Sequence, residues 1–487
     1  MTELDDKQVT VVVEGDSHIK LEATYSSAVK AAGQLPSGFD PSAQYTSRFH
    51  PRGLQLSVLG ASDALHSMGI EWQTITAAVA PDQIGVYSTS VMSQLDDNGL
   101  GGLLKARLKG ERVTTKQLAL GLNSMPADFI NAYVLGSAGS TASIAGACAS
   151  FLYNLRAGLQ DIQSGRRRVV MVGSSEAPIT PEIIDGYATM SALATDEKLA
   201  KLDGVDGPDY RRSSRPFAEN CGFTLAESAQ YIILMDDELA VELGACIHGA
   251  VTDVFVNADG YKKSISAPGP GNYLTFAKAV ASAVNLLGED VVRKQSFIQA
   301  HGSSTPQNRV TESEIFDRVA RVFDINDWPV TAVKSYIGHS LAPASGDQLI
   351  NSLGVFNQGV LPGIKTIDAV ADDVHQERLA IACEDVKLEQ LPAVAFLNSK
   401  GFGGNNATAC IISPDQTKTM LLKRHGKAQM QLHAERCEVT QQRADQYQQS
   451  ALQGDFNVYY HFGQNMIDDE QLLICLLYTS PSPRDRG

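Results

Sequence analysis

The chain has 487 residues, a formal net charge of −15 and 43% apolar residues, which is the composition of a globular protein with a large core. The negative charge disfavours non-specific nucleic-acid binding, which requires clustered Lys and Arg. No apolar stretch approaches the ~20 residues of a membrane span, and the acidic start (MTELDD) is unlike a signal peptide. We therefore expect a cytoplasmic protein without a membrane span.

The seven cysteines are scattered, and none forms a CxxC pair. An odd, unpaired set argues against a disulfide framework and against a zinc site. We therefore expect reduced thiols and no bound metal.

Composition divides the chain into zones. Residues 1–47 are polar, with one strand-like run at Val9–Val13. Residues 48–413 alternate β-branched runs with helical patterns and Gly-rich turns, which predicts an α/β fold. Residues 414–474 are rich in Gln and charge, which predicts an exposed helix or a partly disordered tail. Residues 475–487 (CLLYTSPSPRDRG) look like a translated sequencing adapter, so we exclude them and expect the native C-terminus to be missing.

Cys148 lies at a predicted corner between a strand and a helix that it opens. Small residues precede it, and Phe151, Leu155 and Leu159 follow at helical spacing. A helix N-terminus carries partial positive charge, which favours a thiolate over a thiol. An isolated cysteine is more often buried and inert, so spacing alone leaves a nucleophile and a structural residue both open.

Two histidines follow predicted strands, where α/β proteins place their sites. His301 comes after the apolar pair Phe297-Ile298, and Glu312 lies in the next helical pattern. Lys334 and His339 follow a second strand-like run at residues 330–333. A single histidine is more often structural than catalytic. One cysteine and two histidines at strand ends together favour nucleophilic catalysis.

Residues 398–406 (NSKGFGGNN) form a glycine-rich segment. Its glycines permit a tight turn that can present N–H groups to a ligand, although alone it is better explained as an ordinary turn. A dinucleotide-binding interpretation is weak because position 406 is Asn instead of the third glycine. A hydrolase elbow is disfavoured because GACAS, around Cys148, lacks the second glycine.

A basic cluster lies at Lys105, Arg107, Lys109, Arg112 and Lys116. In an acidic chain it is a candidate docking site for an acidic protein partner. A solvated helix face explains the same spacing, so both interpretations stay open.

The order of these motifs resembles the β-ketoacyl-ACP synthases of the thiolase superfamily. GACAS, HGSSTP, AVKSYIGHS and NSKGFGGNNA each resemble a motif of that family. The resemblance covers residues 48–413 and implies an α/β duplicated thiolase fold with five layers, α-β-α-β-α. Its N-terminal half, with the nucleophile, would span residues 48–245, and its C-terminal half, with the catalytic His and Lys, residues 246–413.

The resemblance implies catalytic roles for Cys148, His301, His339 and Lys334, supporting roles for Glu312 and Phe402, and substrate-binding roles for Ser303, Thr305 and Gly403. It implies no metal or cofactor. Lys400 departs from the family pattern, which has Phe at this position. Residues 1–47 lack the family's first strand with its Gly-x-Gly, so we expect the native N-terminus to be missing.

The resemblance is strongest to the FabY-type initiating synthases, through segments such as HPRGLQLSVLGASDA and SISAPGPGNYLT. It implies condensation of acetyl-CoA with malonyl-ACP, an acyl carrier protein as partner, and a homodimer with Val169–Val172 at its interface. The alternatives are an elongating synthase that takes acyl-ACP, a catalytically silent ketosynthase-like partner, and a Cys/His hydrolase. Cys148 with both histidines argues against the silent partner.

Overall fold

The computed structural model describes residues 2–5, 8–10, 26–264 and 267–464. Its helices are α1 (Arg52–Ser67), α2 (Trp72–Ala78), α3 (Leu100–Lys109), α4 (Gln117–Gly121), α5 (Met125–Ile130), α6 (Ser150–Gln163), α7 (Pro181–Thr189), α8 (Asp196–Asp203), α9 (Asp237–Leu243), α10 (Gly271–Leu287), α11 (Glu289–Lys294), α12 (Pro306–Val322), α13 (Lys334–Ile337), α14 (Ala344–Gln358) and α15 (Pro414–Leu452). Its strands are β1 (Thr2–Asp5), β2 (Gln8–Thr10), β3 (Ile84–Thr89), β4 (Thr141–Ala142), β5 (Val169–Glu176), β6 (Ser228–Met235), β7 (Ala250–Ala258), β8 (Ser296–Gln299), β9 (Trp328–Thr331), β10 (Val360–Leu361), β11 (Leu379–Ile381), β12 (Val386–Lys387), β13 (Val394–Gly401) and β14 (Asn405–Ile412).

Four strands form a first sheet in the order β4-β3-β5-β6. β3 runs parallel to β4 and β5, and β6 runs antiparallel to β5. Every residue of β3 and β5 is buried, as expected for strands covered on both faces. Because β5 is hydrogen bonded on both edges and buried on both faces, it leaves no surface for a second chain. The predicted dimer interface at Val169–Val172 is therefore wrong.

Six strands form a second sheet in the order β11-β9-β8-β13-β14-β7. β8, β9, β11 and β13 run parallel, whereas β14 pairs antiparallel with both β13 and β7. Because β8, β9 and β13 are parallel neighbours, the loops at their carboxyl ends lie at one edge of the sheet. His301, Lys334 and the glycine-rich turn follow these three strands.

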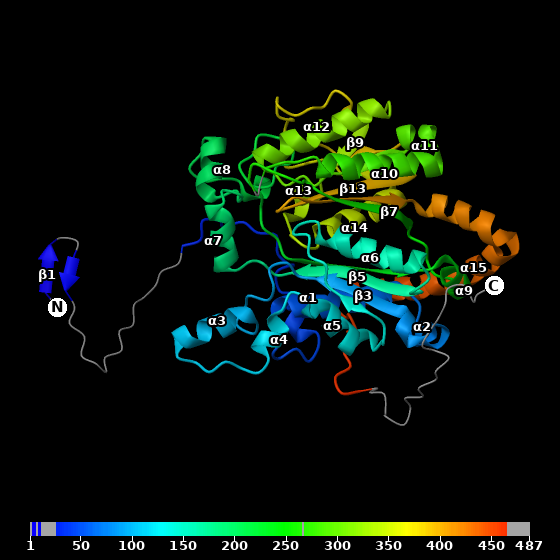
Figure 1. Ribbon diagram of the computed structural model, residues 1–487, viewed down its shortest axis with the longest axis horizontal. Helices are drawn as coiled ribbons and strands as arrows, with labels where there is room; N and C mark the ends of the chain where they lie inside the picture. Colours follow the sequence, from blue (N-terminus) through cyan, green and yellow to red (C-terminus); the bar gives the residue numbers. More distant parts are fainter. Residues whose placement is uncertain (1, 6–7, 11–25, 265–266, 465–487) are drawn as a thin grey trace.

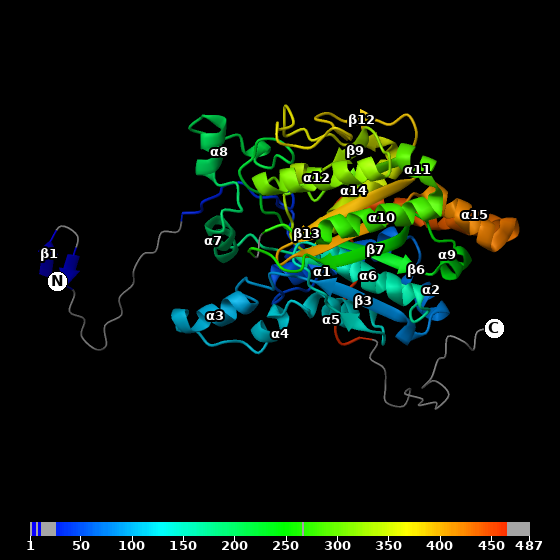
Figure 2. The same cartoon turned by 45° about the horizontal axis from the view of Figure 1, so that its top comes forward.

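The helices form three layers that alternate with the two sheets. α6 contacts β3 and β5 of the first sheet and β7 and β14 of the second, and α14 contacts β6 and β13. On the outer faces, α1 and α5 pack on the first sheet, and α10 packs on the second with α12 beside it. Figure 1 shows α6 and α14 between the sheets and α10 and α12 above them, and Figure 2 shows α6 between β7 and β3 in the turned view. The predicted five-layered α-β-α-β-α fold is confirmed.

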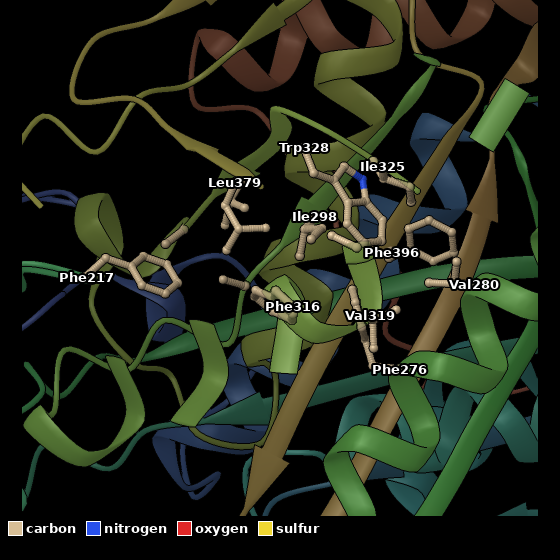
Figure 3. Packing of buried hydrophobic residues seen from close by; sticks show 14 of the residues in the cluster. Phe217, Phe276, Val280, Ile298, Phe316, Val319, Ile325, Trp328, Leu379 and Phe396 are labelled. Carbon is tan, nitrogen blue, oxygen red and sulfur yellow. The ribbon is translucent and has the colours of Figure 1, made fainter. Parts of the chain in front are cut away.

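A buried aromatic cluster joins the second sheet to its outer helices (Figure 3). The ring of Phe276 lies 4.7 Å from that of Phe316, 5.6 Å from that of Trp328 and 6.0 Å from that of Phe396. The indole N–H of Trp328 donates to the Ser296 hydroxyl at 2.8 Å, so its polar atom is satisfied. This core fixes the strands whose ends carry the candidate site.

Residues 414–464 pack on the first half of the molecule. Helix α15 kinks at Gly426, which has a φ of 78°, and then contacts α9 and α1. His433 is buried on this helix, and its Nε2 lies 2.9 Å from the Ala245 carbonyl oxygen. Tyr459 and Tyr460 pack against the core beneath the first sheet. The predicted exposed helix is therefore present: most of its residues are exposed, and one face packs on α9 and α1.

The other segment predictions meet the structure only in part. β2 covers part of the strand expected at Val9–Val13, and residues 11–13 lie outside the described residues, as do residues 475–487. The two sheets draw their strands from residues 84–235 and 250–412. The exact boundaries of the two halves, 48–245 and 246–413, stay predictions.

Candidate active site

Cys148 lies at the strained corner that precedes α6. Ala147 has a φ of 50°, a left-handed conformation that non-glycine residues adopt at a cost in energy. The helix begins at Ser150, so Cys148 lies just ahead of it and does not open it as predicted. Cys148 is 7% exposed. The corner therefore holds a nearly buried thiol close to a helix N-terminus.

The environment of Cys148 favours its neutral form. Burial raises the pKa of the thiol to about 12, Lys334 opposes the increase, and the Glu176 carboxylate adds to it. Desolvation therefore outweighs the helix N-terminus, which had predicted a thiolate. The raised pKa favours the thiol over the thiolate at neutral pH.

The thiol belongs to a small apolar cluster apart from the cores of the two sheets. Buried members include Tyr187, Phe223 and Leu341. The rings of Tyr187 and Phe223 are 5.2 Å apart, and that of Phe402 lies 6.1 Å from Tyr187. Such surroundings suit a short hydrocarbon group carried on the sulfur.

Glu312 holds the backbone at His301. Its Oε1 accepts from the N–H of His301 at 2.7 Å, and its Oε2 accepts from the N–H of Gly302 at 2.9 Å. The side-chain amides of Asn308 and Asn398 donate to the same carboxylate at 2.8 and 2.6 Å. Glu312 is fully buried, and these four donors satisfy it.

Lys334 approaches His301 from the other side. Its Nζ donates to the His301 carbonyl oxygen at 2.6 Å, and the residue is 2% exposed. Burial lowers the pKa of Lys334, while the charges of Glu312, Cys148 and Asp347 act to raise it. Across the described ranges no direct ion pair joins Lys334 to Glu312. The two residues instead fix the His301 backbone from opposite sides.

His339 is held in one tautomer. The N–H of Leu341 donates to Nδ1 of His339 at 3.3 Å, which leaves the proton of a neutral ring on Nε2. The ring centroids of His301 and His339 are 5.4 Å apart, with the planes at 87°. The ring of Phe223, which packs with Cys148, lies 5.2 Å from His339. Phe223 therefore links the nucleophile to the histidine pair.

Both histidines are neutral at neutral pH. Burial lowers the pKa of each well below its ordinary value, and the charge of Lys334 adds to this effect. Nδ1 of His301 is buried and has no hydrogen-bond partner among the described residues. A neutral imidazole has one N–H donor, so the pair can offer two hydrogen bonds to an oxygen of a ligand.

The glycine-rich segment is a hairpin turn between β13 and β14. Gly403 and Gly404 have φ angles of 84° and 90°, which only glycine adopts readily. A Cβ on Gly401 would lie 2.2 Å from the carbonyl oxygen of Gly146 and 3.2 Å from the backbone nitrogen of Cys148. Glycine is therefore required where the turn meets the nucleophile. Phe402 follows and is 36% exposed.

Ser303 and Thr305 lie between β8 and α12. Their hydroxyls are 3.2 Å apart, and Ser304 between them has a φ of 62°. Thr305 stands immediately before the helix. The roles of Ser303, Thr305 and Gly403 in substrate binding stay predictions.

Sequence reasoning missed two polar residues beside Cys148. Glu176, at the end of β5, accepts hydrogen bonds from the Ser90 hydroxyl at 2.6 Å and from the N–H groups of Val91 and Met92 at 2.9 and 3.2 Å. The Ser399 hydroxyl donates to the Cys148 carbonyl oxygen at 3.0 Å. Glu176 follows a buried apolar strand, so the rule that located His301 would also have found it.

The basic cluster is partly neutralised. Lys105 on α3 pairs with Glu182 at 2.7 Å, and Lys109 pairs with Asp97 at 3.3 Å. A docking site and a solvated face both remain compatible with this arrangement.

Two kinds of feature are absent from the described residues. No group of three or more His, Cys, Asp or Glu side chains in this part of the chain is placed to hold a metal ion. None of its helices combines the length and apolarity needed to span a membrane.

Comparison with known sequences places the chain in a family. The family model "Beta-ketoacyl synthase, N-terminal domain" matches residues 5–240, and "Beta-ketoacyl synthase, C-terminal domain" matches residues 248–368. The chain is 62% identical over 468 residues to the Pseudomonas aeruginosa protein "Beta-ketoacyl-[acyl-carrier-protein] synthase FabY", which covers 96% of this chain and 74% of that protein.

Solved structures agree with this placement. The crystal structure of the noncanonical ketosynthase FabY from P. aeruginosa superposes with a TM-score of 0.91 and 64% identity, covering 92% of this chain and 70% of that one. The structure titled "AntDE:AntF (apo): type II PKS acyl-carrier protein in complex with its ketosynthase bound to the hexaketide" has a TM-score of 0.65, covers 80% of this chain and 88% of that one, and at 19% identity shows the fold alone. The chain belongs to the β-ketoacyl synthase family of condensing acyltransferases.

Proposed function

We propose that this chain starts fatty acid synthesis by condensing acetyl-CoA with malonyl-ACP. One observation carries the proposal: a buried thiol, Cys148, shares a site with two neutral histidines of the other half, His301 after β8 and His339 after α13. A thiol suits transient storage of an acyl group, and paired neutral donors suit an enolate oxygen.

In the first step, the sulfur of Cys148 attacks the carbonyl carbon of acetyl-CoA. A new carbon–sulfur bond forms, the bond to CoA breaks, and the thiol proton leaves with the CoA sulfur. The backbone N–H groups of Cys148 and Phe402 would hold the oxyanion. The close approach of Gly401 to the backbone of Cys148 supports this assignment, because it brings the two peptides together.

In the second step, malonyl-ACP loses CO₂. The electron pair of the broken carbon–carbon bond moves onto the thioester as an enolate, whose oxygen would accept hydrogen bonds from His301 and His339. The enolate carbon then attacks the acetyl carbon, the bond to sulfur breaks, and Cys148 leaves as a thiolate that takes a proton from water. Lys334 and Glu312 act by fixing His301. Loss of one such oxyanion donor typically lowers the rate by ~10²–10³.

The proposal includes an acyl carrier protein partner, which the printed name of the P. aeruginosa relative supports. Ser303 and Thr305 would bind the pantetheine arm, and Gly403 would let the turn carrying Phe402 meet the acyl chain. A homodimer and a cytoplasmic location also belong to the proposal. The six cysteines among the described residues are free, in keeping with a reducing compartment.

The test is the intact mass of the protein after incubation with acetyl-CoA and, separately, with short acyl-ACPs, using Cys148→Ala as control. We expect one acetyl adduct from acetyl-CoA, absent in the variant. Acylation only by acyl-ACP would make the chain an elongating synthase. No adduct on a folded sample would favour a silent partner, and an adduct that hydrolyses without condensation would favour a hydrolase.

A further inference from the structure

Lys400 is the departure from the family pattern that the proposed mechanism does not use. It lies on β13, where alternate residues face opposite sides of the sheet. Asn398 and Lys400 reach Glu312 and Thr311 of α12, whereas Ser399 between them reaches Cys148. Lys400 therefore stands on the face of β13 that also holds the support of His301.

The ammonium of Lys400 is poorly satisfied. Its single hydrogen bond to the described residues goes to the Thr311 hydroxyl at 3.0 Å, and no carboxylate of these residues lies within ion-pair distance of it. The Thr311 hydroxyl itself donates to the Gln307 carbonyl oxygen at 3.0 Å. Lys400 is partly buried, and an ammonium carries three donors, so one neutral partner leaves donors open to an anion.

The neighbouring carboxylates are already occupied. Glu312 accepts four hydrogen bonds, as described above. Asp259 accepts from the N–H of Gly271 at 3.0 Å and from the Asn406 amide at 2.8 Å, and it pairs with Lys262 at 3.5 Å. Both carboxylates attract Lys400 only at longer range. The cation is thus available to an anion that enters the site.

Lys400 also lies near the backbone of His301, because its partner Thr311 precedes Glu312, whose carboxylate accepts from the N–H of His301 at 2.7 Å. Burial dominates the lowered pKa of His301, and the charges of Lys334, His339 and Lys400 add to it. Lys334 is engaged with the His301 carbonyl oxygen. An anion attached to a thioester whose oxygen lies at the histidines would therefore meet Lys400.

We propose that Lys400 binds the free carboxylate of the malonyl group and makes this site selective for a dicarboxylic acyl thioester. The inference deepens the proposed function and rests on it. The phosphate of the carrier arm is excluded as the partner, because the full pantetheine length separates it from the thioester. The acetyl primer has no carboxylate, so its transfer to Cys148 does not involve Lys400.

The role is in binding and not in the chemical step. When the carbon–carbon bond breaks, CO₂ leaves as a neutral molecule and the charge passes to the thioester oxygen at the histidines. The ammonium then loses its partner, so the contact is stronger before the transition state than in it. An interaction of this kind affects KM more than kcat.

The direct test is calorimetric binding of two amide analogues, in which NH replaces the thioester sulfur of malonyl-pantetheine and of acetyl-pantetheine. We expect the wild type to prefer the malonyl analogue, and Lys400→Met to lose about tenfold or more of this preference, as removal of a charged hydrogen bond does. Lys400→Arg should retain most of it. An equal preference in wild type and Lys400→Met would overturn the inference.

The matched control is Lys278→Met. Lys278 is exposed on α10, and its ammonium likewise donates to one neutral side chain, Asn257, at 3.3 Å. It should leave the preference unchanged, and circular dichroism should show all variants folded. In turnover, Lys400→Met should raise KM for malonyl-ACP while the acetyl adduct on Cys148 forms as in the wild type. The binding test needs no turnover, so failure of condensation and failure of the Lys400 role are distinguishable.

Discussion

The two halves surround their catalytic groups in opposite ways. Cys148 lies in an apolar cluster, and burial, helped by the charge of Glu176, raises the pKa of its thiol. His301 lies in a dense polar network in which Glu312 and Lys334 fix its peptide on both sides. A nucleophile that must store a hydrocarbon group needs a dry pocket, whereas donors that must meet a developing charge need fixed positions. We therefore expect that substitutions in one half can disable acyl transfer to Cys148 or malonyl decarboxylation separately.

The largest effects on activity should come from substituting the catalytic residue of one half at a time. Cys148→Ala should abolish the acetyl adduct and all condensation. His301→Ala should keep the adduct and lower malonyl decarboxylation by about 10²–10³, since it removes one donor to the enolate oxygen. Intact mass measures the first half-reaction, and CO₂ release from malonyl-ACP measures the second. Full decarboxylation by His301→Ala would contradict the assignment of roles.

The polar network should dominate stability. Glu312→Ala leaves four buried donors without their acceptor. It also removes the carboxylate whose charge does most to raise the pKa of buried Lys334. We expect a loss of about 4 kcal/mol in the free energy of unfolding, because uncompensated buried charge and unpaired donors are costly. Urea unfolding measures it. Glu314→Ala, on the same helix but partly exposed and paired with Arg318, should change it by less than ~1 kcal/mol. Similar effects of the two variants would show that the network is not critical.

The Cys148 side of the site has its own buried carboxylate, Glu176, and it should make the free energy of unfolding depend on pH. Burial raises the pKa of Glu176 from 4.5 to about 7 in the folded chain. The folded state therefore keeps a proton that the unfolded state releases, so this contribution to stability is full below pH 4.5 and is lost as pH rises to about 7. The loss is about 3 kcal/mol. Glu176→Gln cannot titrate, so the stability of wild type relative to this variant should fall by that amount between pH 4.5 and 7.5 in urea unfolding. A stability difference between wild type and Glu176→Gln that stays constant across this range would show that the pKa of Glu176 is the same in the folded and unfolded chain. Glu314→Gln is the control for the general pH dependence of stability.

The same contrast explains what the sequence could predict. His301 and Lys334 follow a local rule, because each comes just after a parallel strand, β8 or β9, and the carboxyl ends of such strands collect at one edge. Cys148 stands just before α6 and His339 follows α13, so the family resemblance was needed to assign them. The α/β class follows from the alternating elements, and the layer order follows from the family resemblance. Such features depend on residues close together in the chain, so the sequence alone predicts them.

Long-range partners were beyond the same reasoning. Nothing local shows that Glu312 binds the N–H of His301 instead of pairing with Lys334, or that burial outweighs the helix N-terminus at Cys148. The strand at Val169–Val172 was misjudged because its second neighbour, β6, comes some sixty residues later. These outcomes depend on which segments fold against each other, and a single sequence does not specify this.

The smallest effect is expected at the surface of the N-terminal half. Lys105 on α3 pairs with Glu182 on α7, the helix that also carries Tyr187 of the apolar cluster. The pair is exposed on both sides, so Lys105→Ala should change the free energy of unfolding by less than ~0.5 kcal/mol. Because Glu182 already neutralises Lys105, we also expect KM for malonyl-ACP to stay unchanged, as for a solvated face. Arg112→Ala is the comparison variant, and its KM is measured alongside. A several-fold rise in KM that disappears at high salt would instead make the basic cluster a docking site, because exposed charges act on an acidic partner through a screened field.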